Sequence, residues 1–144
     1  MIRSRILQLV VWAAAFWIAY EFLWYEQYKL AGRTLIFDVL SSWSGIPEKP
    51  FRLSVAGMEM AAAILVLIPR SQAVGGLFAW GIMSGAIVFH IATPLGIDPY
   101  EDGGMLFKEA VFTWFTGLLI VVARRRELAG LARRLLPAAR PVVT

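Results

Sequence analysis

The chain has 144 residues and a formal net charge of +4; 59% of its residues are hydrophobic and only 17% are charged. A soluble domain is about 45–50% apolar and roughly a quarter charged, and a fold of this size cannot hide so much apolar surface from water. The composition therefore excludes a soluble globule and a disordered chain, and the absence of cysteine excludes disulfides, thiolate zinc sites and iron–sulfur clusters held by this chain alone.

Four continuous apolar runs predict helices that span a membrane. Roughly 20 residues at about 1.5 Å per residue cross the hydrocarbon of a bilayer. None of the runs alternates apolar and polar residues as barrel strands do. The predicted fold class is therefore all-α: a polytopic membrane protein with a four-helix bundle inside residues 1–126. The predicted spans are residues 6–25, 51–68, 73–92 and 105–123.

The first connection, residues 26–50, is too long to lack structure in a compact protein. Apolar residues in its middle recur at helical spacing, which predicts a short helix on the extracytoplasmic face. We expect residues 41–50, which contain two prolines, to form a loop. The apolar residues of the short helix are Leu35, Ile36, Val39, Leu40 and Trp43.

The tail, residues 127–144, is basic and amphipathic. Leu128 and Leu131 lie on one stripe beside Arg133 and Arg134, which predicts a helix on the cytoplasmic surface of the membrane, ended by Pro137.

Lysine and arginine are distributed unevenly between the two sides of the bundle. Nine lie at the N-terminus, in the turn after the second span and in the tail, whereas the first connection and the start of the second span carry four. The positive-inside rule therefore predicts cytoplasmic N- and C-termini. Because most of the basic residues lie on the predicted cytoplasmic side, we expect them to contact a lipid bilayer and not a nucleic acid.

Ionisable residues within the spans all fall in the extracytoplasmic half. Such residues are costly in a membrane and usually face the interior of a bundle. Glu59 lies eight residues into the second span, too deep to reach water by itself, and Glu109 shares a polar face with Thr113 and Thr116. The other ionisable residues in the spans or at their ends are Glu21, Arg52, His90 and Lys108.

These residues predict a paired network. Three acids balance three bases when His90 is protonated, which lowers the cost of burying the charges. The alternative is that Glu21, Arg52, His90 and Lys108 extend to the outer interface and leave the bundle interior. A di-metal centre in a bundle needs Glu-x-x-His on two helices, which this sequence lacks, so no metal is expected.

Small residues predict where helices approach one another. Gly81 and Gly85 form one small-xxx-small pair on the third span, and Gly75 and Ala79 form another. We expect both pairs to pack inside one bundle. The oligomeric state stays open.

Several short motifs follow one another in a distinctive order. Tyr28–Gly32 (YKLAG) follows the first span, Ala56–Met60 (AGMEM) lies in the second, His90 ends the third, and Gly103–Gly104 precedes Lys108–Glu109 at the fourth. Over about residues 5–125, this set resembles the DoxX family of small four-helix membrane proteins, with its Lys-Leu-x-Gly, Gly-x-Glu and Gly-Gly-x-x-x-x-Glu segments. The family-like positions are Lys29, Gly32, Glu59, His90, Gly104 and Glu109.

The resemblance implies an inner-membrane protein, since family members are linked to thiosulfate:quinone oxidoreductase and to membrane complexes of oxidative stress. We expect a redox-linked accessory subunit that binds a quinone or similar amphiphile, with no resident cofactor and with a soluble or membrane redox partner. The expected ligand or proton network is Glu21, Lys29, Arg52, Glu59, His90, Lys108 and Glu109. The expected pocket lining is Trp17, Trp24, Tyr25, Phe89, Phe112 and Thr113.

Two other functions stay open. The same acids would suit a proton relay in a small-solute transporter or channel, although the sequence has no inverted repeat or broken helix. The chain would also suit a non-catalytic membrane anchor for a soluble enzyme complex. Whether the protein is an enzyme is therefore left open by the sequence.

Overall fold

The computed structural model describes residues 2–135, with side chains from residue 4 onward. This part of the chain is helical throughout and contains no strand. Four of its helices, α1, α3, α4 and α5, are long and apolar enough to cross a membrane, which confirms the predicted all-helical class and the four spans. The helices are α1 (Ile2–Ala31), α2 (Leu35–Ser44), α3 (Glu48–Leu67), α4 (Gln72–Ala92), α5 (Met105–Ala123) and α6 (Arg125–Leu135).

Helix boundaries follow hydrogen bonding and not the limits of the apolar runs. The fourth span is as predicted and the third begins one residue earlier, but α1 continues to Ala31, six residues past its predicted end. The expected loop over residues 41–50 is wrong at both ends, because α2 runs to Ser44 and α3 begins at Glu48. Pro50 fits in the first turn of α3, where a helix needs no N–H donor. The predicted helix end at Pro137 lies outside the described residues.

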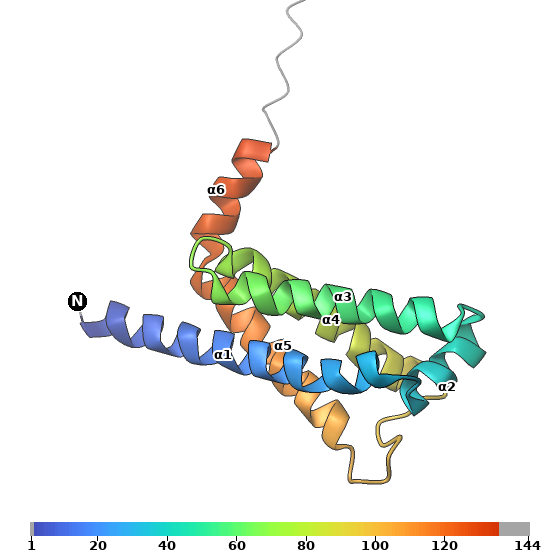
Figure 1. The fold of residues 1–144 in the computed structure, drawn as a ribbon. Helices are drawn as coiled ribbons and strands as arrows, with labels where there is room; N and C mark the ends of the chain where they lie inside the picture. The colour runs from blue at the N-terminus through green and yellow to red at the C-terminus, as the bar shows by residue number, and fades with distance from the viewer. Residues whose placement is uncertain (1, 136–144) are drawn as a thin grey trace, which may run out of the picture.

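The four long helices form a closed ring in which α1 packs on α3, α3 on α4, α4 on α5, and α5 on α1 (Figure 1). Helix α2 packs on α3 at one end of the bundle, where α1 and α4 finish, and we call this the α2 end. The start of α1, the α3–α4 turn and α6 gather at the opposite end, the α6 end. The ring encloses an apolar core that includes Ala15, Ile18, Ala62, Val66 and Ile120.

Glycines set how closely neighbouring helices approach. A Cβ added at Gly75 would lie 2.3 Å from the backbone nitrogen of Val66, so α3 and α4 touch backbone to backbone near the turn that joins them. Gly117 of α5 approaches Trp80 of α4 in the same way, with a hypothetical Cβ 2.9 Å from its nitrogen. Small residues permit this contact between helices.

The pair formed by Gly81 and Gly85 does not pack as expected. A Cβ added at Gly81 or Gly85 would meet nothing within 4 Å. These two glycines therefore face open space on α4, and the prediction that they pack against another helix is wrong.

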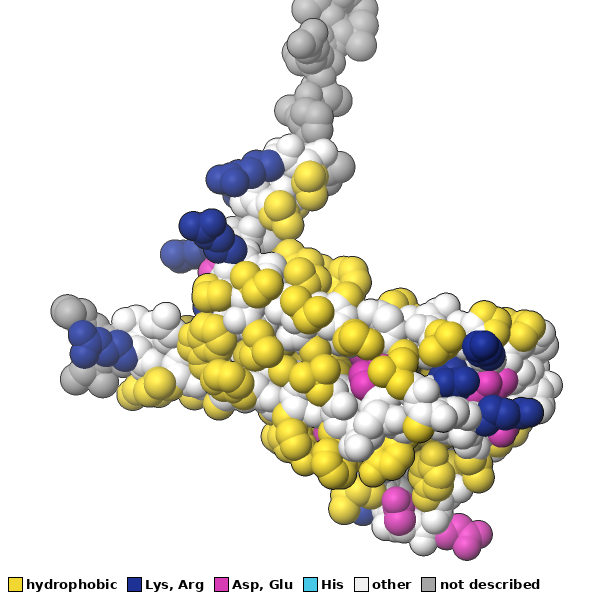
Figure 2. Space-filling model, in the orientation of Figure 1, with side chains coloured by type: hydrophobic (Ala, Val, Ile, Leu, Met, Phe, Trp, Pro, Cys, Tyr) yellow, Lys and Arg dark blue, Asp and Glu magenta, His cyan; other side chains and the backbone are white. Residues whose placement is uncertain are grey.

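Basic and apolar side chains are separated along the length of the bundle. Hydrophobic side chains cover its flank, and lysine and arginine gather at the two ends (Figure 2). This distribution suits helices that lie in lipid and end in water.

Candidate functional site

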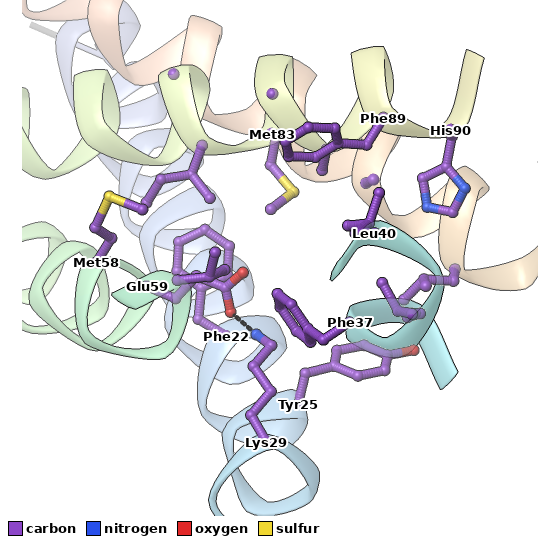
Figure 3. Close-up of a pocket in the computed structure, with 18 of the residues that line it drawn as sticks. Phe22, Tyr25, Lys29, Phe37, Leu40, Met58, Glu59, Met83, Phe89 and His90 are labelled. Atoms are coloured by element: carbon purple, nitrogen blue, oxygen red, sulfur yellow. Dashed lines mark hydrogen bonds and ion pairs between the residues drawn. The ribbon is translucent and has the colours of Figure 1, made fainter. Parts of the chain in front are cut away.

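A cavity of about 610 Å³ lies in the half of the bundle nearest the α2 end. Helices α1, α3 and α4 supply most of its wall, and α2 closes one side with Phe37 and Leu40 (Figure 3). Both of these side chains are buried, and Phe37 contacts Phe51 edge to face with ring centroids 5.6 Å apart. Gly81 and Gly85 line the α4 side, so the space in front of these glycines is part of the cavity.

The cavity opens on the flank of the bundle. Met58 of α3 and Leu77 and Phe78 of α4 line it and are each more than 40% exposed, whereas Phe22 at its base is buried. Helices α3 and α4 touch at Gly75, close to their turn, and the wall opens farther along α4, from Leu77 to Gly85. The opening thus lies between two helices that are long and apolar enough to span a membrane.

The wall of the cavity also carries the charged side chains of Glu21, Lys29 and Glu59. Lys29, near the end of α1, forms an ion pair with Glu59 of α3 (Figure 3) and a second with Glu26, at 3.2 Å from Nζ to Oε1. Arg52 of α3 does not join Glu59: its Nε donates to Glu48 at 2.6 Å, and Nη1 donates to the carbonyl of Lys29. The arginine therefore ties the last turns of α1 to α3 and holds Lys29 in place.

Glu21 of α1 also lines the cavity and is 6% exposed. Within residues 4–135 its carboxyl group makes no hydrogen bond or ion pair with another side chain. It is close enough to Glu59, Glu109 and Lys29 to interact electrostatically with all three. The carboxyl oxygens of Glu21 are not among the fully enclosed atoms that lack a partner, and Glu21 lines the cavity, so a ligand there could donate hydrogen bonds to them.

His90, near the end of α4, lines the cavity and is 4% exposed. Its Nδ1 lies 2.6 Å from the carbonyl oxygen of Gly96. Because a carbonyl can only accept, Nδ1 carries a proton, and a neutral ring then leaves Nε2 as an acceptor. The ring packs edge to face on Phe107, with centroids 5.5 Å apart.

The loop over residues 93–104 carries the carbonyl that orients His90. Asp98 accepts the backbone N–H groups of Asp102, at 3.0 Å, and of Gly103, at 3.2 Å. Desolvation raises the pKa of Asp98, but backbone donors from Gly104, Asp102 and Gly103 outweigh it and hold the pKa below its ordinary value. Gly104 has φ +72°, and a Cβ there would lie 2.8 Å from the carbonyl oxygen of Ile97, so only glycine fits.

The sequence-predicted site residues divide into two groups. Glu21, Lys29, Glu59 and His90 lie on the cavity wall, together with Tyr25 and Phe89 from the expected lining. The remaining predicted residues lie away from the wall: Arg52, Lys108, Glu109, Trp17, Trp24, Phe112 and Thr113.

The residues away from the wall form their own contacts. Glu109 accepts from the Tyr25 hydroxyl, and Lys108 is exposed. Thr113 is fully buried and accepts from Trp17 Nε1 at 2.9 Å. Phe112 and Trp24 face outward, because their positions on α5 and α1 are on the side turned from the ring interior.

Sequence reasoning missed four residues that shape the site. Glu26 was assigned to a loop, but α1 continues through it and buries it beside Lys29. Glu48 is the partner of Arg52, a pairing that the i, i+4 spacing could have shown once α3 was known to begin there. Phe37 and Leu40 lie one turn apart on α2 and form the buried face of that helix.

The arrangement is suited to hold a small molecule with an apolar body and a polar head. Pockets that bind such molecules are mostly apolar with a few placed polar groups. Within the described part of the chain, no three His, Asp or Glu side chains gather closely enough to hold a metal ion. Comparison of the chain with protein-family models, with curated proteins and with solved structures gives no match.

Proposed function

We propose that this chain is an integral membrane protein that binds a lipid-soluble amphiphile in the cavity of its α2 end. The observation that carries the proposal is the position of the cavity: its opening lies between α3 and α4, and charged side chains from α1 and α3 line its wall. A molecule dissolved in the bilayer would enter sideways, with its polar head leading. A water-soluble solute would have to cross the apolar flank first.

The size and lining of the cavity support this proposal. A volume of about 610 Å³ falls within the range of roughly 300–1,000 Å³ that small-molecule sites occupy. Phe22, Phe51 and Phe89 provide rings for a flat or aliphatic body, and Lys29 with Glu59 lies where the head would rest.

A quinone is the amphiphile to which the DoxX resemblance points. In that case the chain acts as a redox-linked accessory subunit in a cell inner membrane, with α2 on the extracytoplasmic side and α6 on the cytoplasmic surface. Electrons would come from a soluble or membrane partner, because the sequence offers no cysteine and one histidine. Lys29 would donate to a quinone carbonyl, and Glu59 would exchange the proton.

The α6 half of the bundle favours binding over transport. Its interior is built from Val11, Ala14, Ala63 and Val66, and the ionisable side chains buried in the bundle all lie toward the α2 end. A proton or solute route through one chain needs polar groups along its whole length. Among the described residues, Gln72 is the one buried polar side chain near the α6 end, and it has no hydrogen-bond partner.

The proposal is tested by filling the cavity. Gly81→Leu would place a side chain in the open space on α4, while Gly57→Leu makes the same change at an exposed glycine of α3 outside the wall. Each protein is purified in nanodiscs and titrated with a decyl-substituted ubiquinone, and co-purified lipids are identified by mass spectrometry. We expect Gly81→Leu to weaken binding at least tenfold and Gly57→Leu to leave it within threefold. Equal binding by all three proteins, or no binding by the parent chain, would refute the proposal.

A further inference from the structure

The hydrogen-bonding groups on the cavity wall are mostly acceptors. Tyr25 already donates to Glu109, and the Nδ1 proton of His90 is held by Gly96. Lys29 gives two of its three ammonium protons to Glu26 and Glu59. One proton of Lys29 therefore remains as a donor, whereas the oxygens of Glu21 and Nε2 of His90 remain as acceptors. A matching ligand has to bring hydrogen-bond donors.

The charges around the cavity also fail to balance. The sequence predicted three acids against three bases, but Arg52 is paired with Glu48 and Lys108 is exposed. Glu26 joins the acids instead. Glu26 and Glu59 both pair with the ammonium of Lys29, and the Glu21 carboxyl group lies within electrostatic reach of the same ammonium.

A cation inside an aromatic cavity would correct both imbalances. Cations bind the faces of aromatic rings, and more strongly where water is excluded. Six phenylalanine and tyrosine rings line the cavity, and two of them, Phe51 and Phe89, touch edge to face with centroids 6.0 Å apart. The rings are Phe22, Tyr25, Phe37, Phe51, Phe78 and Phe89.

We propose that the preferred ligands of this cavity are lipid-soluble amines, whose protonated head is held by Glu21 and whose apolar tail lies along the opening between α3 and α4. The inference rests on the proposed function, because it requires that the cavity bind amphiphiles at all. The ammonium donates to the Glu21 carboxylate and to Nε2 of His90. The tail runs past Gly81 toward Met58 and Phe78, where the wall is exposed.

The test compares three ligands that share one alkyl tail and differ in their polar head. Decylamine, decan-1-ol and a decyl-substituted ubiquinone share a ten-carbon chain and differ in being a cationic donor, a neutral donor and an acceptor. Binding is measured by native mass spectrometry and by thermal shift in zwitterionic detergent, at a pH where the amine is protonated. The proteins are the full parent chain, Glu21→Gln, Gly81→Leu and Glu101→Gln. Glu101 is an exposed acid at the same end of the bundle and off the cavity wall, so it controls for loss of charge.

We expect the parent chain to bind decylamine at least tenfold more tightly than decan-1-ol or the quinone. Glu21→Gln should reduce amine binding at least tenfold and leave decan-1-ol binding within threefold, which also shows that the variant is folded. Glu101→Gln should leave both ligands within threefold. Gly81→Leu should lose all three ligands.

Two results overturn the inference while leaving the proposed function intact: equal binding of amine and quinone by the parent chain, or an amine-to-alcohol ratio unchanged by Glu21→Gln. Absence of binding of any decyl compound by the parent chain overturns both.

Discussion

Glycine has two opposite roles along a single helix, α4. Near the start of α4, Gly75 lies against the backbone of α3 and Gly76 against Ile120 of α5, so the absence of a side chain lets helices touch. About one and a half and two and a half turns farther on, Gly81 and Gly85 touch nothing and leave the wall of the cavity open. The sequence shows the same residue type in both places, and only the packing of α3 and α5 distinguishes them.

Replacing Gly75 by alanine should destabilise the bundle. The added Cβ would meet the Val66 backbone, which cannot move like a flexible side chain. Overpacking of this kind costs about 1–3 kcal/mol. Unfolding in mixed micelles, followed by circular dichroism, measures the loss. Gly57→Ala is the matched control: it should be neutral or stabilising by up to about 1 kcal/mol, because its site is open and alanine favours helix. A Gly75→Ala protein as stable as this control would contradict the close contact.

At the scale of elements, the spans were predictable because lipid requires long apolar helices whatever their neighbours. The boundaries of α1 and α3 were not, because helical hydrogen bonds extend past the apolar runs. The site was only partly predictable. Glu21, Glu59 and His90 could be identified as charges out of place in lipid, but the wall formed by Phe37 and Leu40 depends on where α2 folds back.

Partner choice among charges was the least predictable feature. Arg52 and Glu59 lie on one stripe of α3, yet Arg52 pairs with Glu48, one turn away, and leaves Glu59 to Lys29 of α1. Spacing along a helix gives the candidates for a pair, whereas the contact between α1 and α3 decides which pair forms. The outward position of Trp24 has the same origin, since rotation of a helix about its axis is set by its neighbours.

The loop over residues 93–104 should respond to acid through Asp98. Because backbone donors lower the pKa of Asp98 in the folded loop, its contribution to loop stability is complete above the unfolded pKa of about 3.9 and is lost as the pH falls through the lower folded value. In NMR spectra, the amide protons of Asp102 and Gly103 should shift with a midpoint below 3.9. Asp98→Asn should abolish that titration, and a midpoint above 3.9 would contradict the geometry.

At the scale of the whole molecule, the chain has one chemical advantage for mapping its orientation: it contains no cysteine. A single cysteine can therefore be placed at Arg70, in the turn at the α6 end, or at Glu101, in the loop at the α2 end. If the positive-inside rule holds, a membrane-impermeant maleimide added to intact bacterial spheroplasts should label Glu101→Cys. Arg70→Cys should react only after permeabilisation. The reverse pattern would invert the proposed topology.

The backbone contact at Gly75 and Val66 also limits how α3 and α4 can separate. If the two helices stay in contact at that point, they can separate only by rotating about it, and Gly85 lies about 15 Å along α4 from the contact. A swing of about 4° would then part the far arms by about 1 Å while the pivot stays closed. We therefore expect larger ligands to enter through a small rotation of α3 relative to α4, with the positions of α1 and α5 unchanged.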